Sequence, residues 1–179
     1  SKHSEEQKMI EFSYVNILIK WIKQKYNLDF KILDINNESS DVDVTIKNCA
    51  SFQEIYIQCV EFRASKSSYK TVSDSLCSES IEPVSFKLTF INIPNDIDYK
   101  KEIESVIRTK ENHYGSPEYL TLVIGIIIPN FTLDIVESLE LNSISTKFKG
   151  CYLVQGAYND HPGTGYVFEV KSSFIDVQV

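Results

Sequence analysis

The chain has no hydrophobic run long enough to span a membrane. The longest, LVIGIII at 122–128, is far shorter than the ~20 apolar residues that cross a bilayer. No charged segment followed by an apolar one opens the sequence, so no signal peptide is expected. We therefore expect a soluble, cytoplasmic protein that does not associate with membranes.

The sequence also lacks the usual motifs for zinc and for phosphate. Its four cysteines form no CxxC pair, and its three histidines fall at no ligand spacing with them. The wide spacing of the four cysteines, two of them in strand-like runs, favours reduced, buried thiols of a cytosolic protein. Only six glycines occur, and none of them forms a glycine-rich phosphate loop.

Positive charge is scarce as well. Lys and Arg number 18 against 25 Asp and Glu, a formal net charge of −7. Nucleic-acid binding is therefore possible but not favoured, because such proteins normally present a basic face to the phosphates. A protein partner stays open, and the oligomeric state is not predicted. Two small basic clusters are candidate patches or simply solvated faces: Arg63, Lys66 and Lys70, and Lys100, Lys101, Arg108 and Lys110.

What is present is a hydrophobic pattern that predicts helices and strands in one domain. With 179 residues, 42% of them hydrophobic, the chain can form a single core. Residues 5–26 repeat apolar residues at helical spacing. Segments 29–35, 41–46 and 54–62 alternate like strands and are joined by short links, which favours an antiparallel meander.

The second half of the chain predicts a parallel strand and further helices. Segment 64–83 has little periodicity and is expected to be a loop insertion. Segment 119–128 is apolar on both faces, as in a parallel strand covered on both sides. The remaining predictions are a strand at 84–93, a helix at 95–115 capped by Asn95 or Asp96, a short helix at 132–141, and strands at 150–156 and 165–171. Together the elements predict an α/β (α+β) fold: a central mixed β-sheet flanked by helices.

Several polar residues fall at positions where apolar ones are expected. Gln58 lies inside the strand IYIQCV, and alternation places Asp41 or Asp43 of the preceding strand on the same face. Glu11 stands in line with the apolar stripe of the first helix. Buried polar groups are costly unless they are bonded or employed, so these residues are candidates for a site.

Lys110 repeats this anomaly in the second predicted helix. It follows Ile103 and Ile107 on the apolar stripe, and Tyr114 lies one turn further along. A lysine near a helix C-terminus can also lay its stem over apolar neighbours and keep its ammonium in water. Lys110 is therefore a candidate either for a site residue or for a structural lysine.

These residues and their order resemble the PD-(D/E)xK, or restriction-endonuclease-like, superfamily. In that pattern the Asp matches Asp43, or less well Asp41, and the Glu or Gln matches Gln58. The helical Glu matches Glu11, and some branches place a Lys and a Tyr where this chain has Lys110 and Tyr114. The resemblance extends from Glu5 to Gln155 and implies a restriction-endonuclease-like fold.

The resemblance implies a magnesium-dependent nuclease. Glu11, Asp43 and Gln58 would supply oxygen ligands for Mg²⁺, and Lys110 would assist hydrolysis of a phosphodiester. One position departs from the pattern, since Val60 stands where the family usually has Lys. That departure keeps a second function open, namely a catalytically inactive binding, regulatory or immunity-type protein on the same scaffold.

A second match to the family's string lies near the C-terminus. Asp160 is followed by Glu169 and Lys171, which alternation places on one strand face. Only eight residues follow Lys171, too few for the helix and strand that come next in the family. We therefore expect an edge strand whose Glu and Lys meet solvent.

Overall fold

The computed structural model describes residues 2–33, 41–63, 97–128, 130–156 and 165–174. The helices are α1 (Lys2–Tyr26), α4 (Tyr99–His113) and α5 (Leu133–Ser138), with 3₁₀ turns η1 (Pro117–Tyr119) and η2 (Leu141–Ser143). The strands are β1 (Phe30–Leu33), β2 (Val44–Asn48), β3 (Glu54–Phe62), β4 (Leu120–Ile126), β5 (Gly150–Gln155) and β6 (Tyr166–Lys171).

The six strands form one mixed sheet in the order β1-β2-β3-β4-β5-β6. β1, β2 and β3 pair antiparallel, as the short links predict. β4 pairs parallel with both β3 and β5, and every residue of it is buried. The continuous apolar run therefore marks the centre of the sheet, and β6 closes it antiparallel to β5.

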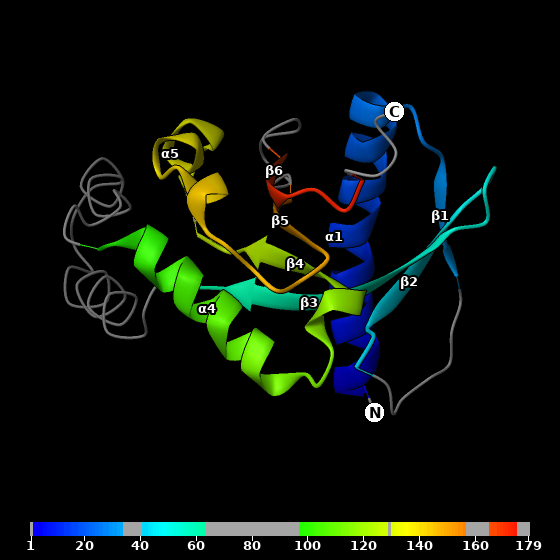
Figure 1. The fold of residues 1–179 in the computed structure, drawn as a ribbon, viewed down its shortest axis with the longest axis horizontal. Helices are drawn as coiled ribbons and strands as arrows, with labels where there is room; N and C mark the ends of the chain where they lie inside the picture. The colour runs from blue at the N-terminus through cyan, green and yellow to red at the C-terminus, as the bar shows by residue number, and fades with distance from the viewer. Residues whose placement is uncertain (1, 34–40, 64–96, 129, 157–164, 175–179) are drawn as a thin grey trace, which may run out of the picture.

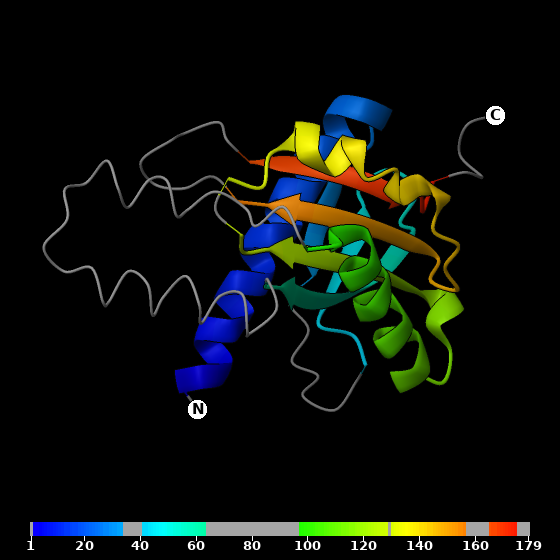
Figure 2. The ribbon, with the colours of Figure 1, turned by 90° about the vertical axis from the view of Figure 1, so that its left-hand side faces the viewer.

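Helices cover both faces of this sheet (Figure 1). α1 lies on one face, where Val15, Leu18 and Ile22 pack against residues such as Ile57 and Val123. α4 lies on the other face (Figure 2), and α5 contributes to the same apolar cluster as α4. The chain is thus an α+β fold with its core in two layers, one on each side of the sheet.

Some element boundaries differ from the predictions. α1 begins at Lys2, and α4 begins at Tyr99 because Asp98 accepts the N–H of Lys101 as its N-cap. β2 begins at Val44, so Asp43 precedes the strand. The predicted insertion at 64–83 and the predicted strand at 84–93 lie outside the described residues.

The described cysteines, Cys49, Cys59 and Cys151, are all free thiols, as expected. Cys151 is buried and Cys59 is half-buried, but Cys49 is exposed in the turn between β2 and β3, so the expectation of burial is wrong for that residue. Among the described residues, no helix is long and apolar enough to cross a membrane.

Candidate functional site

The candidate site centres on the point where β2 and β3 stop pairing as regular strands. Val44 lies opposite Ile57, and the N–H of Asp43 donates to the carbonyl of Ile57 at 2.9 Å. The carboxylate of Asp43 then accepts the backbone N–H of Cys59 at 2.8 Å. A side-chain oxygen therefore takes the place of a backbone acceptor on β3, and Asp43 is fixed at this fork between the strands.

Gln58 lies on β3 beside this fork. Its side chain is only 9% exposed, and its Oε1 has no hydrogen-bond partner among the described residues. Alternation along β3 places Gln58 with Val60 and Phe62 on the face covered by α4. A buried acceptor without a donor is uncommon, and it marks Gln58 as a candidate ligand residue within the described part of the chain.

α4 brings two more residues to Asp43. Burial raises the pKa of Asp43, while the Cys59 N–H and the ammonium of Lys110 oppose that rise. Burial, together with Asp43 and Asp41, also raises the pKa of Tyr114 to about 12. Lys110 and Tyr114 therefore lie within electrostatic range of Asp43, and the Tyr114 hydroxyl stays protonated at neutral pH.

Glu11 approaches the fork from α1, on the opposite face of the sheet from Gln58. Its side chain is buried, and Gln7 donates a hydrogen bond to it at 3.2 Å. Burial first, and then the nearby carboxylates of Asp43 and Glu61, raise the pKa of Glu11. Glu11 and Glu61 line a small pocket with Tyr14 and Cys59.

The thiol of Cys59 is not activated by these neighbours. Burial raises its pKa well above the ordinary value, and the carboxylates of Asp43 and Glu11 add to the rise. A thiol that stays protonated is a poor nucleophile. Cys59 therefore contributes to the packing of the fork, and the chemistry depends on oxygen and ammonium groups.

The donor atoms fit a hard divalent cation in kind. Asp43 and Glu11 offer carboxylate oxygens, and Gln58 offers an amide oxygen that lacks a partner among the described residues. Within the same part of the chain, however, no three His, Cys, Asp or Glu side chains are grouped closely enough to hold a metal ion. A bound ion at the fork would therefore depend on Asp43, on the amide of Gln58 and on water.

The described residues of the second match to the family's string bond to opposite sides of the sheet. Glu169 accepts hydrogen bonds from Tyr26 and Lys25 of α1, whereas Lys171 donates to the carbonyls of Thr146 and Phe148 on the α4 side. A β-bulge separates the two residues, so the expectation that they share a face and meet solvent is wrong. Asp160 lies outside the described residues.

The surroundings of two carboxylates, Glu61 and Glu111, are not predicted from the sequence. Alternation places Glu61 on the face away from Gln58, but it does not reveal that Glu61 lies beside Glu11. Glu111 is buried in α4 because Tyr99, Ile103, Ile107 and Glu111 recur every four residues. That spacing is visible in the sequence and identifies Glu111, rather than Lys110, as the charged member of the buried stripe; Lys110 is half-buried on its flank.

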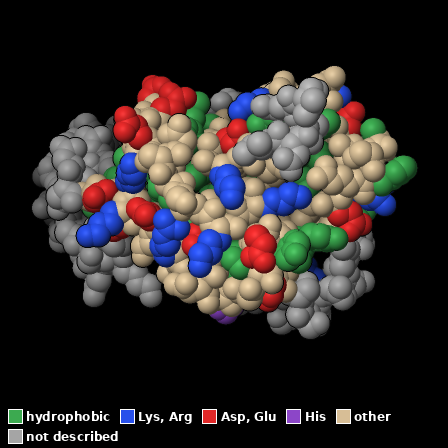
Figure 3. All heavy atoms as spheres, viewed as in Figure 1, with side chains coloured by type: hydrophobic (Ala, Val, Ile, Leu, Met, Phe, Trp, Pro, Cys, Tyr) green, Lys and Arg blue, Asp and Glu red, His purple; other side chains and the backbone are tan. Residues whose placement is uncertain are grey.

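The face that carries α4 shows positive and negative side chains interleaved (Figure 3). Arg108 forms ion pairs with Glu104 at 3.2 Å and with Glu111 at 2.8 Å. Arg63 similarly pairs with Glu61. The arginine of each candidate basic cluster is thus neutralised by its own neighbours, while Lys66 and Lys70 lie outside the described residues.

In comparisons with known proteins, no family model, curated protein or solved structure matches the chain. The class that the structure defines is therefore architectural: an α+β protein with a six-stranded mixed sheet between helices.

Proposed function

We propose that the protein is a metal-dependent phosphodiesterase of the PD-(D/E)xK type, with a reduced set of site residues. The observation that carries the proposal is the fork itself, where Asp43 bonds the backbone of Ile57 and Cys59 on either side of the buried Gln58. Glu11 and Lys110 lie within electrostatic range of Asp43. The order of the described helices and strands, α1-β1-β2-β3-α4-β4, with β4 parallel to β3, supports a restriction-endonuclease-like core. The Oε1 of Gln58, which has no partner among the described residues, supports a missing ligand beside the fork.

Each residue has a role that its surroundings favour. Asp43 and Gln58, together with water, would hold Mg²⁺, which supplies charge stabilisation and an activated water when bound, and Glu11 would add negative charge from the other face of the sheet. Burial that raises the pKa of both carboxylates makes them electrostatically receptive to a cation. Lys110, near Asp43, would stabilise negative charge on the phosphodiester from α4 in place of the missing lysine at position 60.

A second function, binding without catalysis, is favoured by the small number of candidate metal ligands at the fork. No third carboxylate joins Asp43 and Glu11 closely enough in the described part of the chain to hold a metal, and Val60 offers no charge. The carboxylate of Asp43 is also already engaged by the N–H of Cys59. On this alternative the same scaffold would act as a regulatory or immunity-type partner of another protein.

Thermal denaturation with Mg²⁺ or Mn²⁺ tests the metal site. Because a ligand that binds only the folded state stabilises it, the melting temperature should rise in the wild type and much less in Asp43→Ala. Asp41→Ala is the matched control, since Asp41 is an exposed acid two residues away. Equal responses in the wild type and in Asp43→Ala would remove Asp43 from any metal site.

Hydrolysis of single- and double-stranded oligonucleotides with Mg²⁺ separates the two functions. The enzyme function requires cleavage by the wild type that Asp43→Ala and Lys110→Met abolish. Gln58→Glu should keep or increase the metal response, because a carboxylate is a better hard ligand than an amide. A metal response without cleavage, or no response at all, would instead support the binding protein.

A further inference from the structure

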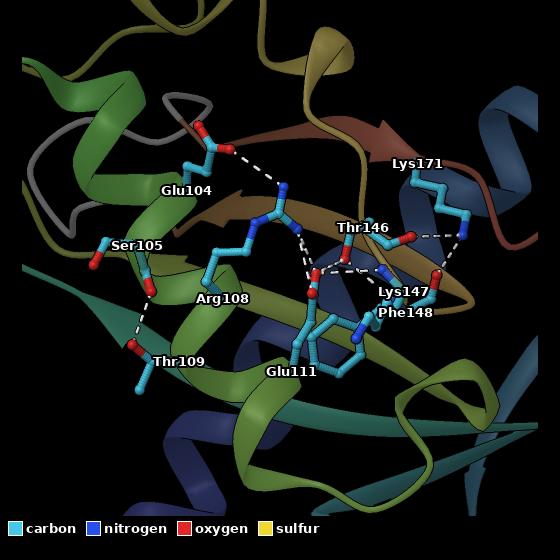
Figure 4. A network of polar contacts seen from close by, with 9 residues as sticks. All are labelled: Glu104, Ser105, Arg108, Thr109, Glu111, Thr146, Lys147, Phe148 and Lys171. Carbon is cyan, nitrogen blue, oxygen red and sulfur yellow. Dashed lines mark hydrogen bonds and ion pairs between the residues drawn. The ribbon is translucent and has the colours of Figure 1, made fainter.

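A network of charged and polar groups fixes α4 against the segment that leads into β5 (Figure 4). The side chain of Glu111 is 4% exposed and accepts hydrogen bonds from three residues. Arg108 donates to both of its oxygens, at 2.8 and 3.2 Å, and the hydroxyl of Thr146 donates at 2.8 Å. The backbone N–H of Lys147 donates at 3.3 Å. Glu111 therefore connects the last turns of α4 directly to residues 146–147.

The same segment is held from its other side by β6. Lys171 donates to the carbonyls of Thr146 and Phe148, at 3.1 and 2.6 Å (Figure 4). Phe148 is fully buried, and Lys149 donates its N–H to the carbonyl of Leu120 at the start of β4. Residues 146–149 are thus anchored to the sheet, and they offer Glu111 a fixed attachment point.

This attachment controls the orientation of Lys110. Successive residues of an α-helix differ by about 100° around the axis, so the direction of Glu111 sets the direction of its neighbour. Glu111 reaches the segment before β5, while the ammonium of Lys110 acts electrostatically on the carboxylate of Asp43. Hydrogen bonds are directional, whereas the apolar contacts of Ile103 and Ile107 are not, so the polar network is suited to fix the rotation of the helix.

We infer that Glu111 is a positioning residue, which holds α4 in the rotation that keeps Lys110 within electrostatic range of Asp43. The inference rests on the proposed function, in which Lys110 acts at the fork. Glu111 itself does not touch a reacting group in this scheme. It acts only through the helix that it shares with Lys110.

A double-mutant cycle measures the contact that Glu111 is inferred to hold. Asp43→Asn, Lys110→Met and their combination give the coupling between the two residues from urea denaturation at low ionic strength. The same cycle is then measured in a Glu111→Gln background. The coupling should be present in the wild-type background and clearly smaller in the Glu111→Gln background, while general loss of stability cancels within each cycle.

Glu104→Gln is the matched control. Glu104 also pairs with Arg108 but lies outside the set of bonds that joins α4 to residues 146–147, so the Asp43–Lys110 coupling should be unchanged. If Glu111→Gln does not fold, Thr146→Val removes one donor to the same carboxylate and should lower the coupling less. An unchanged coupling in the folded Glu111 or Thr146 variant overturns the positioning role alone. Absence of any coupling in the wild-type background removes Lys110 from the fork and overturns both proposals.

Discussion

The two polar clusters beside α4 differ in how fully their buried groups are bonded. Toward β5, the carboxylate of Glu111 accepts hydrogen bonds from a guanidinium, a hydroxyl and a backbone N–H. Toward β3, among the described residues, Gln58 Oε1 has no donor, and burial raises the pKa of Asp43. Proteins normally satisfy their buried polar groups, and the exceptions concentrate at sites of function.

Burial of a charged side chain does not by itself identify a functional site. Glu111 is as buried as Glu11, at 7% and 8% exposure, yet the hydrogen bonds of Glu111 all stabilise the fold. Glu11 accepts one such bond, from Gln7, and its burial first and then the carboxylates of Asp43 and Glu61 raise its pKa. The hydrogen bonds that offset the burial, rather than its depth, distinguish the fork around Asp43 from the network around Glu111.

The largest expected effect is at the bonded cluster. Glu111→Ala leaves Arg108, the Thr146 hydroxyl and the Lys147 N–H without their common acceptor, and should lower the free energy of unfolding by about 2–3 kcal/mol. Glu104→Ala, which removes only a solvent-exposed ion pair, should cost under about 1 kcal/mol. Urea denaturation compares the two, and similar losses would contradict the structural role of Glu111.

A somewhat smaller loss is expected beneath the pocket that Glu11 lines. A Cβ on Gly125 would lie 2.5 Å from two ring atoms of Tyr14, so Gly125→Ala should displace that ring and cost about 1–3 kcal/mol. Gly115→Ala is the control, because a Cβ there meets nothing within 4 Å. If both variants unfold at the same temperature, the packing of the Tyr14 ring against Gly125 of β4 does not contribute to stability.

The pH dependence of stability tests the electrostatic cost at Glu11. The pKa of Glu11 is raised above its ordinary 4.5, so the folded state binds its proton more tightly than the unfolded state does. The stabilising contribution of Glu11 to the free energy of unfolding is thus fully present below pH 4.5, and it is lost as the pH rises through the folded-state pKa. Without metal, Glu11→Gln should flatten that decline in the free energy of unfolding; parallel profiles would show that Glu11 carries no such cost.

The smallest effect is expected at Gln58. Gln58→Met should change the free energy of unfolding by less than about 1 kcal/mol, because its buried oxygen has no hydrogen bond to lose among the described residues. Gln155→Met is the comparison on β5, where the amide donates to the carbonyl of Ile128, and it should cost about 1–2 kcal/mol. A larger loss of stability in Gln58→Met than in Gln155→Met would mean that the Gln58 amide makes a hydrogen bond that stabilises the fold.

Much of the fold could be predicted because its signals are local. The alternation of 54–62 gives β3 with its observed ends, and the apolar run of 119–128 indicates the central parallel strand. The burial of Glu11 and Gln58 also follows from periodicity within single elements. These predictions succeed because each depends on the sequence of one segment alone.

The features that could not be predicted depend on contacts between distant segments. Nothing near Glu111 in the sequence indicates that Thr146 and Lys147 will bond it. The start of β2 is displaced because the side chain of Asp43, instead of its backbone, bonds Cys59. In the same way, the faces of Glu169 and Lys171 are set by one extra residue in β6, which alternation cannot detect.

That extra residue has a consequence for contacts between molecules. β6 lies at one edge of the sheet formed by the described strands, and a regular edge presents a row of free N–H and C=O groups that another chain can pair with. At the bulge Lys171 lies opposite Cys151 while Glu169 lies opposite Tyr152, so Val170 interrupts the regular spacing of the strand. The ammonium of Lys171 is also turned inward onto backbone carbonyls. A strand from a second molecule would meet an irregular edge, which disfavours sheet extension and aggregation through β6.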